Sequence, residues 1–216
     1  ALWTGGGLFA HGNQAHNITY CQFTNNSVSV NGGGLKLHFA SANITNTTIA
    51  NNSAGDGSGI VIESLDPINI LNSIIYGNIG GNQVQLINSA PILTITYSDI
   101  QGNWSGIGNI DQDPLFVDTT NSDYHLQVSS PCIDAGHPSI SYNDPNGTRN
   151  DMGAYPYDSC ANGATNSITT ISTCDSSYTW NDSTYTQTGT YSYSESSNNY
   201  SLDLDHNNET WIEVPY

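Results

Sequence analysis

The stretch NITYCQFTNNSVSVNGGGLKLH, residues 17–38, returns at residues 43–64 as NITNTTIANNSAGDGSGIVIES, which indicates a stack of similar units. Within each unit apolar and polar residues alternate, as they do along β-strands, and glycine clusters separate the strand-like segments. Four series recur at steps of 24 to 27 residues: Ile18, Ile44, Ile70 and Ile95; Phe23, Ile49, Ile75 and Ile100; Leu8, Leu35, Ile60 and Val84; and Cys21, Thr47, Ser73 and Ser98.

This period predicts an all-β solenoid. Leucine-rich repeats have a similar length, but their Leu-x-x-Leu-x-Leu frame is absent, and propeller blades need about 40 residues. In a parallel β-helix each coil lies about 4.8 Å from the next, so equivalent residues stack directly. We therefore expect an apolar stack of Ile18, Ile44, Ile70 and Ile95 and a ladder of side-chain amides formed by Asn26, Asn52, Asn78 and Asn103.

The two repeats resemble the right-handed β-helix of large bacterial surface proteins in the pectate-lyase-like superfamily. GNIDQDPLFVD (108–118), DYHLQVSSPCIDAG (123–136) and DMGAYPY (151–157) are similar to the closing region that often ends such helices, ahead of a surface-anchoring module. TCDSSYTWNDSTYTQTGTYSY (173–193) resembles a short β-rich repeat of secreted Bacteroidetes proteins. That repeat usually continues to a second cysteine, which this chain lacks, so the resemblance implies a substitute disulfide between Cys160 and Cys174.

These features divide the chain into three parts. We expect β-helix coils over residues 1–110, a last coil and closing lid over residues 111–157, and a small C-terminal β module over residues 158–216. The module has alternating tyrosines, which suggest hairpins around Asn181 and Asp182.

The composition excludes some classes of binding partner. The chain has 216 residues and a net charge of −17, and its only basic residues apart from histidine are Lys36 and Arg149. Binding to a phosphate backbone needs clustered lysine and arginine, so neither nucleic acid nor an anionic membrane is an expected partner. No apolar run of transmembrane length occurs, and we expect no membrane insertion. A polar, β-rich chain in which only 10% of the residues are charged is typical of extracellular or cell-surface proteins.

The first coil begins at the N-terminus without a preceding cap, because ALWTGGGLFAHGN aligns with the coil sequence VNGGGLKLHFAS. Uncovered coils expose unpaired backbone groups, which solenoids normally protect. Two explanations remain open: the chain is a fragment of a longer protein, or the open coil docks on a second copy in a head-to-tail filament.

The repeat also bears on catalysis. β-Helix enzymes that act on polysaccharides place acids or bases on neighbouring coils. Asp99 is the acid to consider, but its equivalents in the earlier coils are Ile74, Thr48 and Gln22, which are not acidic. A polyuronate lyase would also need more basic residues than two. We therefore expect no enzyme activity, and we expect Arg149 to pair with acids of its own loop.

Two groups of residues are candidate metal ligands. His11, His38 and Glu63 share one register and are expected to point outward from three successive coils, where they could bind a transition metal such as zinc. Asp144, Asn146 and Asp151 surround a glycine turn and offer oxygen ligands to calcium, although side chains capping their own turn explain these residues equally well.

The expected function is that of an extracellular, non-catalytic structural or adhesive β-solenoid, with self-assembly or binding to a surface polysaccharide as its interaction. The alternative is a polysaccharide-binding or polysaccharide-degrading domain in which Trp104, Trp180 and Trp211 stack on sugars. We expect no cofactor, and calcium is the one candidate that the sequence offers.

Overall fold

The structure is a computed structural model that describes residues 5–12, 14–87, 92–157, 166–173, 178–180, 183–185, 187, 189–195 and 198–206. The chain forms two compact units, Ala1–Tyr157 and Asp158–Tyr216. Twelve strands of the first unit build the solenoid: β1 (Leu8–His11), β2 (Ala15–Thr19), β3 (Gln22–Thr24), β4 (Leu35–His38), β5 (Ser41–Thr45), β6 (Thr48–Ala50), β7 (Ile60–Glu63), β8 (Ile68–Leu71), β9 (Ile74–Tyr76), β10 (Val84–Leu86), β11 (Leu93–Thr96) and β12 (Asp99–Ile100).

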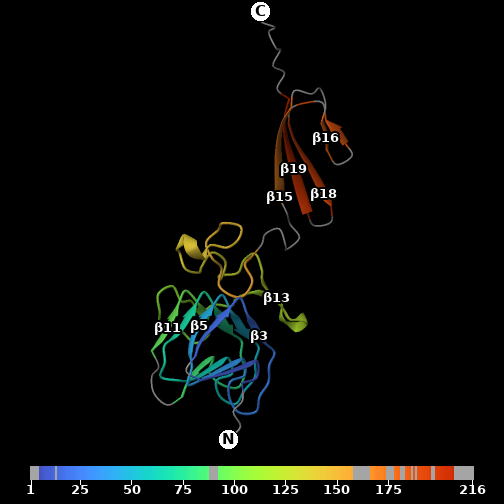
Figure 1. The fold of residues 1–216 in the computed structure, drawn as a ribbon. Coiled ribbons are helices and arrows are strands. Elements are labelled where there is room, and N and C mark those ends of the chain that lie inside the picture. The colour runs from blue at the N-terminus through green and yellow to red at the C-terminus, as the bar shows by residue number, and fades with distance from the viewer. Residues whose placement is uncertain are drawn as a thin grey trace, which may run out of the picture. The chain divides into compact units, whose positions relative to one another are not determined.

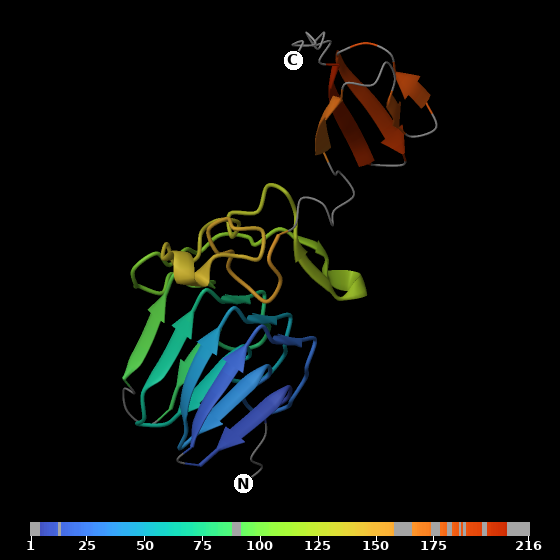
Figure 2. The ribbon, with the colours of Figure 1, turned by 45° about the horizontal axis from the view of Figure 1, so that its top comes forward.

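These strands form three parallel four-stranded sheets (Figures 1 and 2). Sheet I has the order β1-β4-β7-β10, sheet II the order β2-β5-β8-β11, and sheet III the order β3-β6-β9-β12. Each coil contributes one strand to each sheet, so the chain winds into a parallel β-solenoid of about three turns. The predicted fold class is confirmed at this level.

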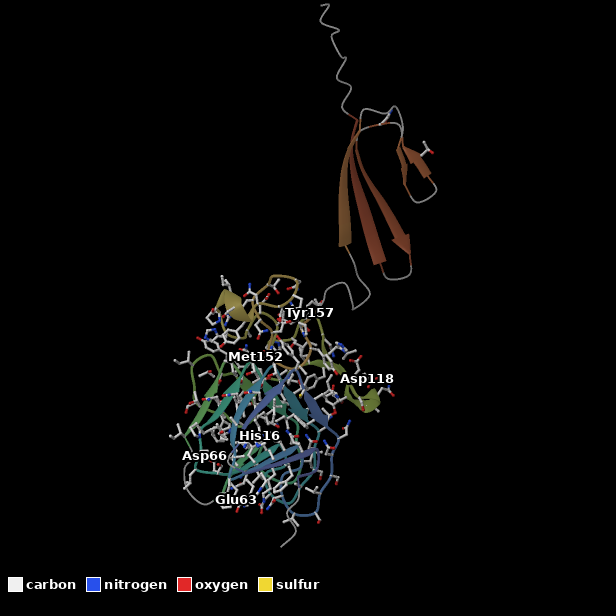
Figure 3. The ribbon with its side chains drawn as sticks, in the orientation of Figure 1. His16, Glu63, Asp66, Asp118, Met152 and Tyr157 are labelled. Atoms are coloured by element: carbon white, nitrogen blue, oxygen red, sulfur yellow. The ribbon has the colours of Figure 1, made fainter. Side chains whose placement is uncertain are left out.

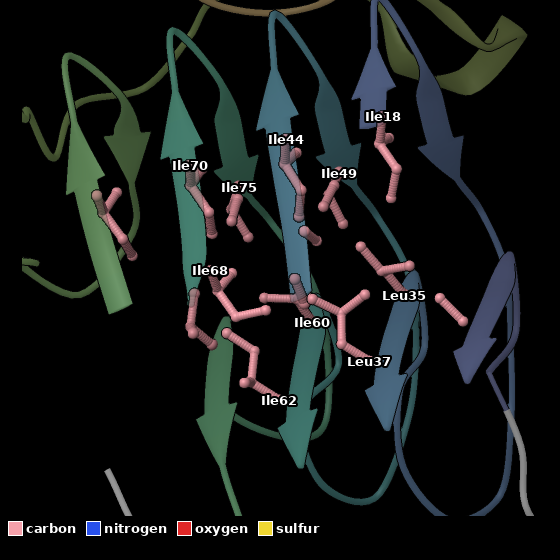
Figure 4. Close-up of a cluster of buried hydrophobic side chains, with 14 of the residues drawn as sticks. Ile18, Leu35, Leu37, Ile44, Ile49, Ile60, Ile62, Ile68, Ile70 and Ile75 are labelled. Carbon is pink, nitrogen blue, oxygen red and sulfur yellow. The ribbon is translucent and has the colours of Figure 1, made fainter. Parts of the chain in front are cut away.

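The register agrees with the repeat. Ile18 pairs with Ile44, Ile44 with Ile70, and Ile70 with Ile95, so the predicted isoleucine stack is confirmed. Figure 4 shows Ile18, Ile44 and Ile70 side by side inside the coils, facing the side chains of sheet I. Burial of this apolar interior is the main favourable contribution to folding.

Left-handed corner residues turn the chain between sheets. Asn46 and Asn72 connect sheet II to sheet III with φ of 47° and 50°, and Asn25 and Asn51 follow sheet III with φ of 58° and 56°. Asparagine is among the few side chains that adopt this conformation readily. Asparagines therefore turn the chain at two corners on each border of sheet III, and Tyr20, Tyr97, Gly77 and Gly102 hold the equivalent corners of the other coils.

Residues 111–157, which we call the strap, lie along the outer face of sheet III. The strap contains β13 (Phe116–Asp118), β14 (Asp123–Leu126) and the 3₁₀ helices Thr119–Asn121 and Ile140–Tyr142. Met152, Leu126 and Cys132 of the strap bury Ile74, whose side chain points outward from β9. We expected a lid on the end of the solenoid; instead, the strap runs along its side, where it covers Ile74 and packs against Tyr76 (Figures 1 and 2).

Both rows of corner asparagines bind the strap. Asn46 donates through Nδ2 to Oδ1 of Asn150 at 3.0 Å, and Oδ1 of Asn72 accepts the backbone N–H of His137 at 2.8 Å. On the other border, the Tyr124 hydroxyl donates to Oδ1 of Asn25 and accepts from Nδ2 of Asn51, both at 3.1 Å. The strap is thereby tied to three successive coils.

The second unit is built of β-strands in its described ranges. β15 (Asn166–Thr173), β19 (Asn198–His206) and β18 (Gly189–Glu195) form one sheet in that order. β16 (Tyr178–Trp180) pairs antiparallel with β17 (Ser183–Tyr185), as the hairpin signal at Asn181 and Asp182 predicted. None of the helices in the described ranges could span a bilayer.

Candidate functional site

Two rows of side chains project from the outer face of sheet I. Phe9, Lys36 and Val61 form one row, and His11, His38 and Glu63 form the second row, as the repeat predicted. Outward-facing side chains on a solenoid are normally exposed, yet Lys36 is 4% exposed and His38 2% exposed. Figure 3 shows Glu63 on the part of the solenoid away from Met152 of the strap. The chain's single lysine therefore lies in an unusually enclosed place.

Glu63 is the centre of this cluster. Its Oε2 lies 3.1 Å from Nζ of Lys36, and its Oε1 lies 3.8 Å from Nε2 of His38. Nζ of Lys36 also donates to Oδ1 of Asn31 at 3.3 Å. Burial lowers the pKa of His38, against the raising effect of Glu63, and so favours the neutral imidazole at pH 7.

The predicted transition-metal ligands share a register but do not converge on one point. The rings of His11 and His38 stack with centroids 5.1 Å apart and planes 22° from parallel. The carboxylate of Glu63 forms an ion pair with Lys36. Throughout the described ranges, no three histidine, cysteine, aspartate or glutamate side chains are grouped so that they could bind a metal ion.

The predicted calcium ligands bind the backbone of the strap instead. Asp144 accepts from Nδ2 of Asn150 at 2.8 Å and from the N–H of Asp151 at 2.9 Å. Asp151 accepts from the N–H of Asp134 at 2.6 Å and also from that of Tyr157. Asn146 lies apart from them and accepts from Thr148 through Oδ1, which is ordinary turn capping. Burial raises the pKa of Asp144, and it raises that of Asp151 to about 6.

The ladder of amides runs through three asparagines and ends differently from our expectation. Asn26 donates through Nδ2 to Oδ1 of Asn52 at 2.9 Å, and Asn52 donates to Oδ1 of Asn78 at 2.8 Å. Asn78 donates to Oε1 of Gln83 at 2.6 Å. Asn103 is not in the ladder, because the chain turns away after β12 and its N–H donates to Asp111. The expectation for Asn103 is thus wrong.

The series of Thr47, Ser73 and Ser98 ends in a similar way. The N–H of Thr47 donates to Oγ of Ser73, that of Ser73 to Oγ of Ser98, and that of Ser98 to Oδ1 of Asn109. Asn109 comes only eleven residues after Ser98 and breaks the period. Gln83 and Asn109 thus provide the acceptors that a further coil would otherwise supply.

Asp99 is completely buried between sheet III and the strap. Its partner in β9 is Ile74 and its bridge partner on the other side is Ile110, so the expectation that no acid stacks on it is confirmed. Its carboxylate accepts the N–H of Gln112 at 3.2 Å and the thiol of Cys132 at 3.3 Å. Sequence reasoning missed Cys132, although Ile74, an apolar residue in an outward register, was a signal that something covers this face.

The other residues singled out in the sequence are Arg149, two cysteines and three tryptophans. Arg149 donates to the carbonyls of Gly136 and Ala135 at 2.7 and 3.1 Å, not to acids of its loop. Trp104 packs against the solenoid core. Cys160, Cys174 and Trp211 lie outside the described residues, as does the side chain of Trp180.

No protein-family model, no curated protein and no solved structure matches this chain.

Proposed function

We propose that the chain is an extracellular, non-catalytic structural or adhesive element of a bacterial surface. The observation that carries the proposal is the continuity of bonding along the solenoid: buried side-chain ladders join each coil to the next, and the strap spans several coils from outside. Such an arrangement resists separation of one coil from another, which is the property that a load-bearing rod needs.

Three side chains favour a structural role over action on a polysaccharide or binding to it. Asp99 is the acid most suited to act on a glycoside by its place in the repeat, but it is fully buried and bonded to the strap. Lys36, the only lysine, is enclosed by its neighbours. Trp104 is held against the core, which leaves it less suited to stack on a sugar.

Two experiments on the full chain test this proposal. In single-molecule pulling between its two ends, we expect the solenoid unit to rupture at high force in one main event. Gradual unwinding of single coils at low force would contradict a load-bearing role. Incubation with a panel of plant, fungal and bacterial polysaccharides should release no oligosaccharides, and release would support the carbohydrate-degrading alternative.

Head-to-tail assembly is a second proposal, favoured by the sheet edges. In the ranges that the structure describes, β1, β2 and β3 each pair on one side only, and so do β10 and β11 at the other end of the sheets. Strand edges that pair on one side only are suited to pairing with a second copy. Sedimentation and electron microscopy over a wide concentration range should show elongated species that dissociate on dilution; a monomer at every concentration would overturn this proposal.

A further inference from the structure

The surroundings of Lys36 are unusual for a lysine. Burying an ammonium group is costly unless charged and polar partners surround it, and lysine normally extends its charge into water. Here the side chain lies in the row between Phe9 and Val61. Its Nζ is 3.1 Å from a carboxylate oxygen of Glu63 and 3.3 Å from the amide oxygen of Asn31.

These three groups have complementary chemistry. An amine is a nucleophile once it loses a proton, a carboxylate is a base, and a side-chain amide has an electrophilic carbon with a nitrogen that can leave as ammonia. We propose that Lys36 and Asn31 become joined by an intramolecular isopeptide bond, which the chain forms by itself with Glu63 as the base. This proposal is independent of the function proposed above.

The reaction balances without any further reagent. Glu63 takes one proton from the Lys36 ammonium, and the lone pair of Nζ attacks Cγ of Asn31, whose C=O electron pair moves onto Oδ1. When the C=O bond re-forms, the bond between Cγ and Nδ2 breaks. Glu63 returns its proton to the leaving nitrogen, and a second proton passes from Nζ in the same direction. The products are a secondary amide and one ammonium ion, and the Glu63 carboxylate is regenerated.

The local fold holds the reacting groups together. Gly32, Gly33 and Gly34 turn the chain between Asn31 and β4, and a backbone bridge between Asn31 and Asp56 holds the start of this turn. Groups held at such separations react as if they were highly concentrated.

The neighbouring glycine offers a competing reaction, which the structure disfavours. In an Asn-Gly sequence the glycine nitrogen can attack Cγ to give a succinimide. The N–H of Gly32 instead donates to the carbonyl of Asp56 at 3.3 Å, and Gly32 is held at φ of 74°. The amine of Lys36 is therefore the nucleophile that the fold presents to Asn31.

Mass spectrometry of the full chain tests the proposal. We expect the intact protein to be lighter than its sequence mass by one molecule of ammonia, and Lys36 to resist trypsin in the denatured chain because trypsin needs a free lysine amine. Fragmentation should yield a branched peptide that joins Asn31 to Lys36. The full sequence mass together with cleavage after Lys36 would overturn the proposal.

Variants separate this bond from other losses of ammonia. Glu63→Gln and Asn31→Ala should each show no ammonia loss and cleavage after Lys36; Asn31→Ala removes only a loop side chain and keeps the test valid if Glu63→Gln fails to fold. Asn43→Ala, on the exposed face of sheet II, is the control and should keep both the loss and the trypsin resistance. Ammonia loss that persists in Asn31→Ala, or that leaves Lys36 open to trypsin as a succinimide would, also contradicts the proposal.

Discussion

The thiol of Cys132 donates a hydrogen bond to Oδ2 of Asp99 across 3.3 Å, and both side chains are fully buried. Burial raises the pKa of Asp99 from 3.8 to about 7; Asp111 and Asp113 act in the same direction, whereas the hydrogen bonds from Gln112 and Cys132 oppose it. Burial also raises the pKa of the Cys132 thiol, which stays protonated. The junction between sheet III and the strap therefore holds a proton that an unfolded chain would release.

This proton makes stability depend on pH. Between about pH 4 and pH 7 the folded chain retains the Asp99 proton while the unfolded chain has lost it, so the free energy of unfolding falls as the pH rises through this window. Asp99→Asn removes the ionisation. We expect the variant to lose this part of the pH dependence and, above pH 7, to gain stability on the order of 4 kcal/mol at most.

Urea unfolding at pH 5 and pH 8 measures this change in the free energy of unfolding. Hydrogen exchange of the core amides of β8 and β9 at the same two pH values assigns the change to the solenoid unit. Asp118→Asn is the matched control. Asp118 is exposed, and its hydrogen bonds with Asn121 lower its pKa, so its contribution to stability is lost as the pH falls. Parallel pH curves for the wild type and Asp99→Asn would show that Asp99 does not hold the proton.

Asn52 lies at the centre of the buried amide ladder. It is fully buried, accepts from the side chain of Asn26 and donates to Asn78 and to the carbonyl of Phe23. Asn52→Ala leaves these groups without their partner inside the coil, and we expect a loss of about 2–4 kcal/mol in the free energy of unfolding. Asn43→Ala should cost about 0.5 kcal/mol or less, because Asn43 bonds to Asn17 and Asn69 on an exposed face. Equal losses in denaturant titrations would mean that the buried ladder contributes no more than the exposed one.

The same asparagines show how much a repeat can predict. Asn26, Asn52 and Asn78 follow the period, and each coil places them at the same height, so their ladder could be read from the sequence. Gln83 and Asn109 could not, because they serve where the repetition stops and their positions depend on the local path of the chain. A period encodes what stacks on what, but it does not say how the stack ends.

The period also could not predict which side chains on the outer faces of the sheets are buried. Lys36 and Asp99 lie in the outward registers of sheets I and III, yet both are enclosed. Their enclosure comes from neighbours outside the repeat or on adjacent strands. The strap covers Asp99. The one sequence signal of this cover is Ile74, an apolar residue in the outward register of Thr48.

Gly153 tests the docking of the strap. It has φ of 103°, and an added Cβ would lie 2.8 Å from Cδ1 of Ile74 and 3.0 Å from Oγ1 of Thr48. Gly153→Ala should therefore both strain the backbone and push the strap away from β9, at a cost of about 2 kcal/mol or more. Gly147→Ala is matched to it, since Gly147 has φ of 88° but nothing within 4 Å of the added atom. Faster amide exchange in the strap is expected for the first variant only; the same change in both would attribute the effect to backbone strain alone.

Calcium should have little effect on stability, because the side chains that could bind it already have other partners. Asp144 and Asp151 accept hydrogen bonds on both of their oxygens, and a cation that needs six to eight oxygen ligands would have to displace several of them. We expect the melting temperature to move by less than about 1 °C between chelator and millimolar calcium. A saturable rise that Asn146→Ala abolishes would place calcium at this turn after all. Asp151→Asn should destabilise the chain equally with and without calcium, since the group keeps one acceptor for the N–H groups of Asp134 and Tyr157 where the carboxylate offers two.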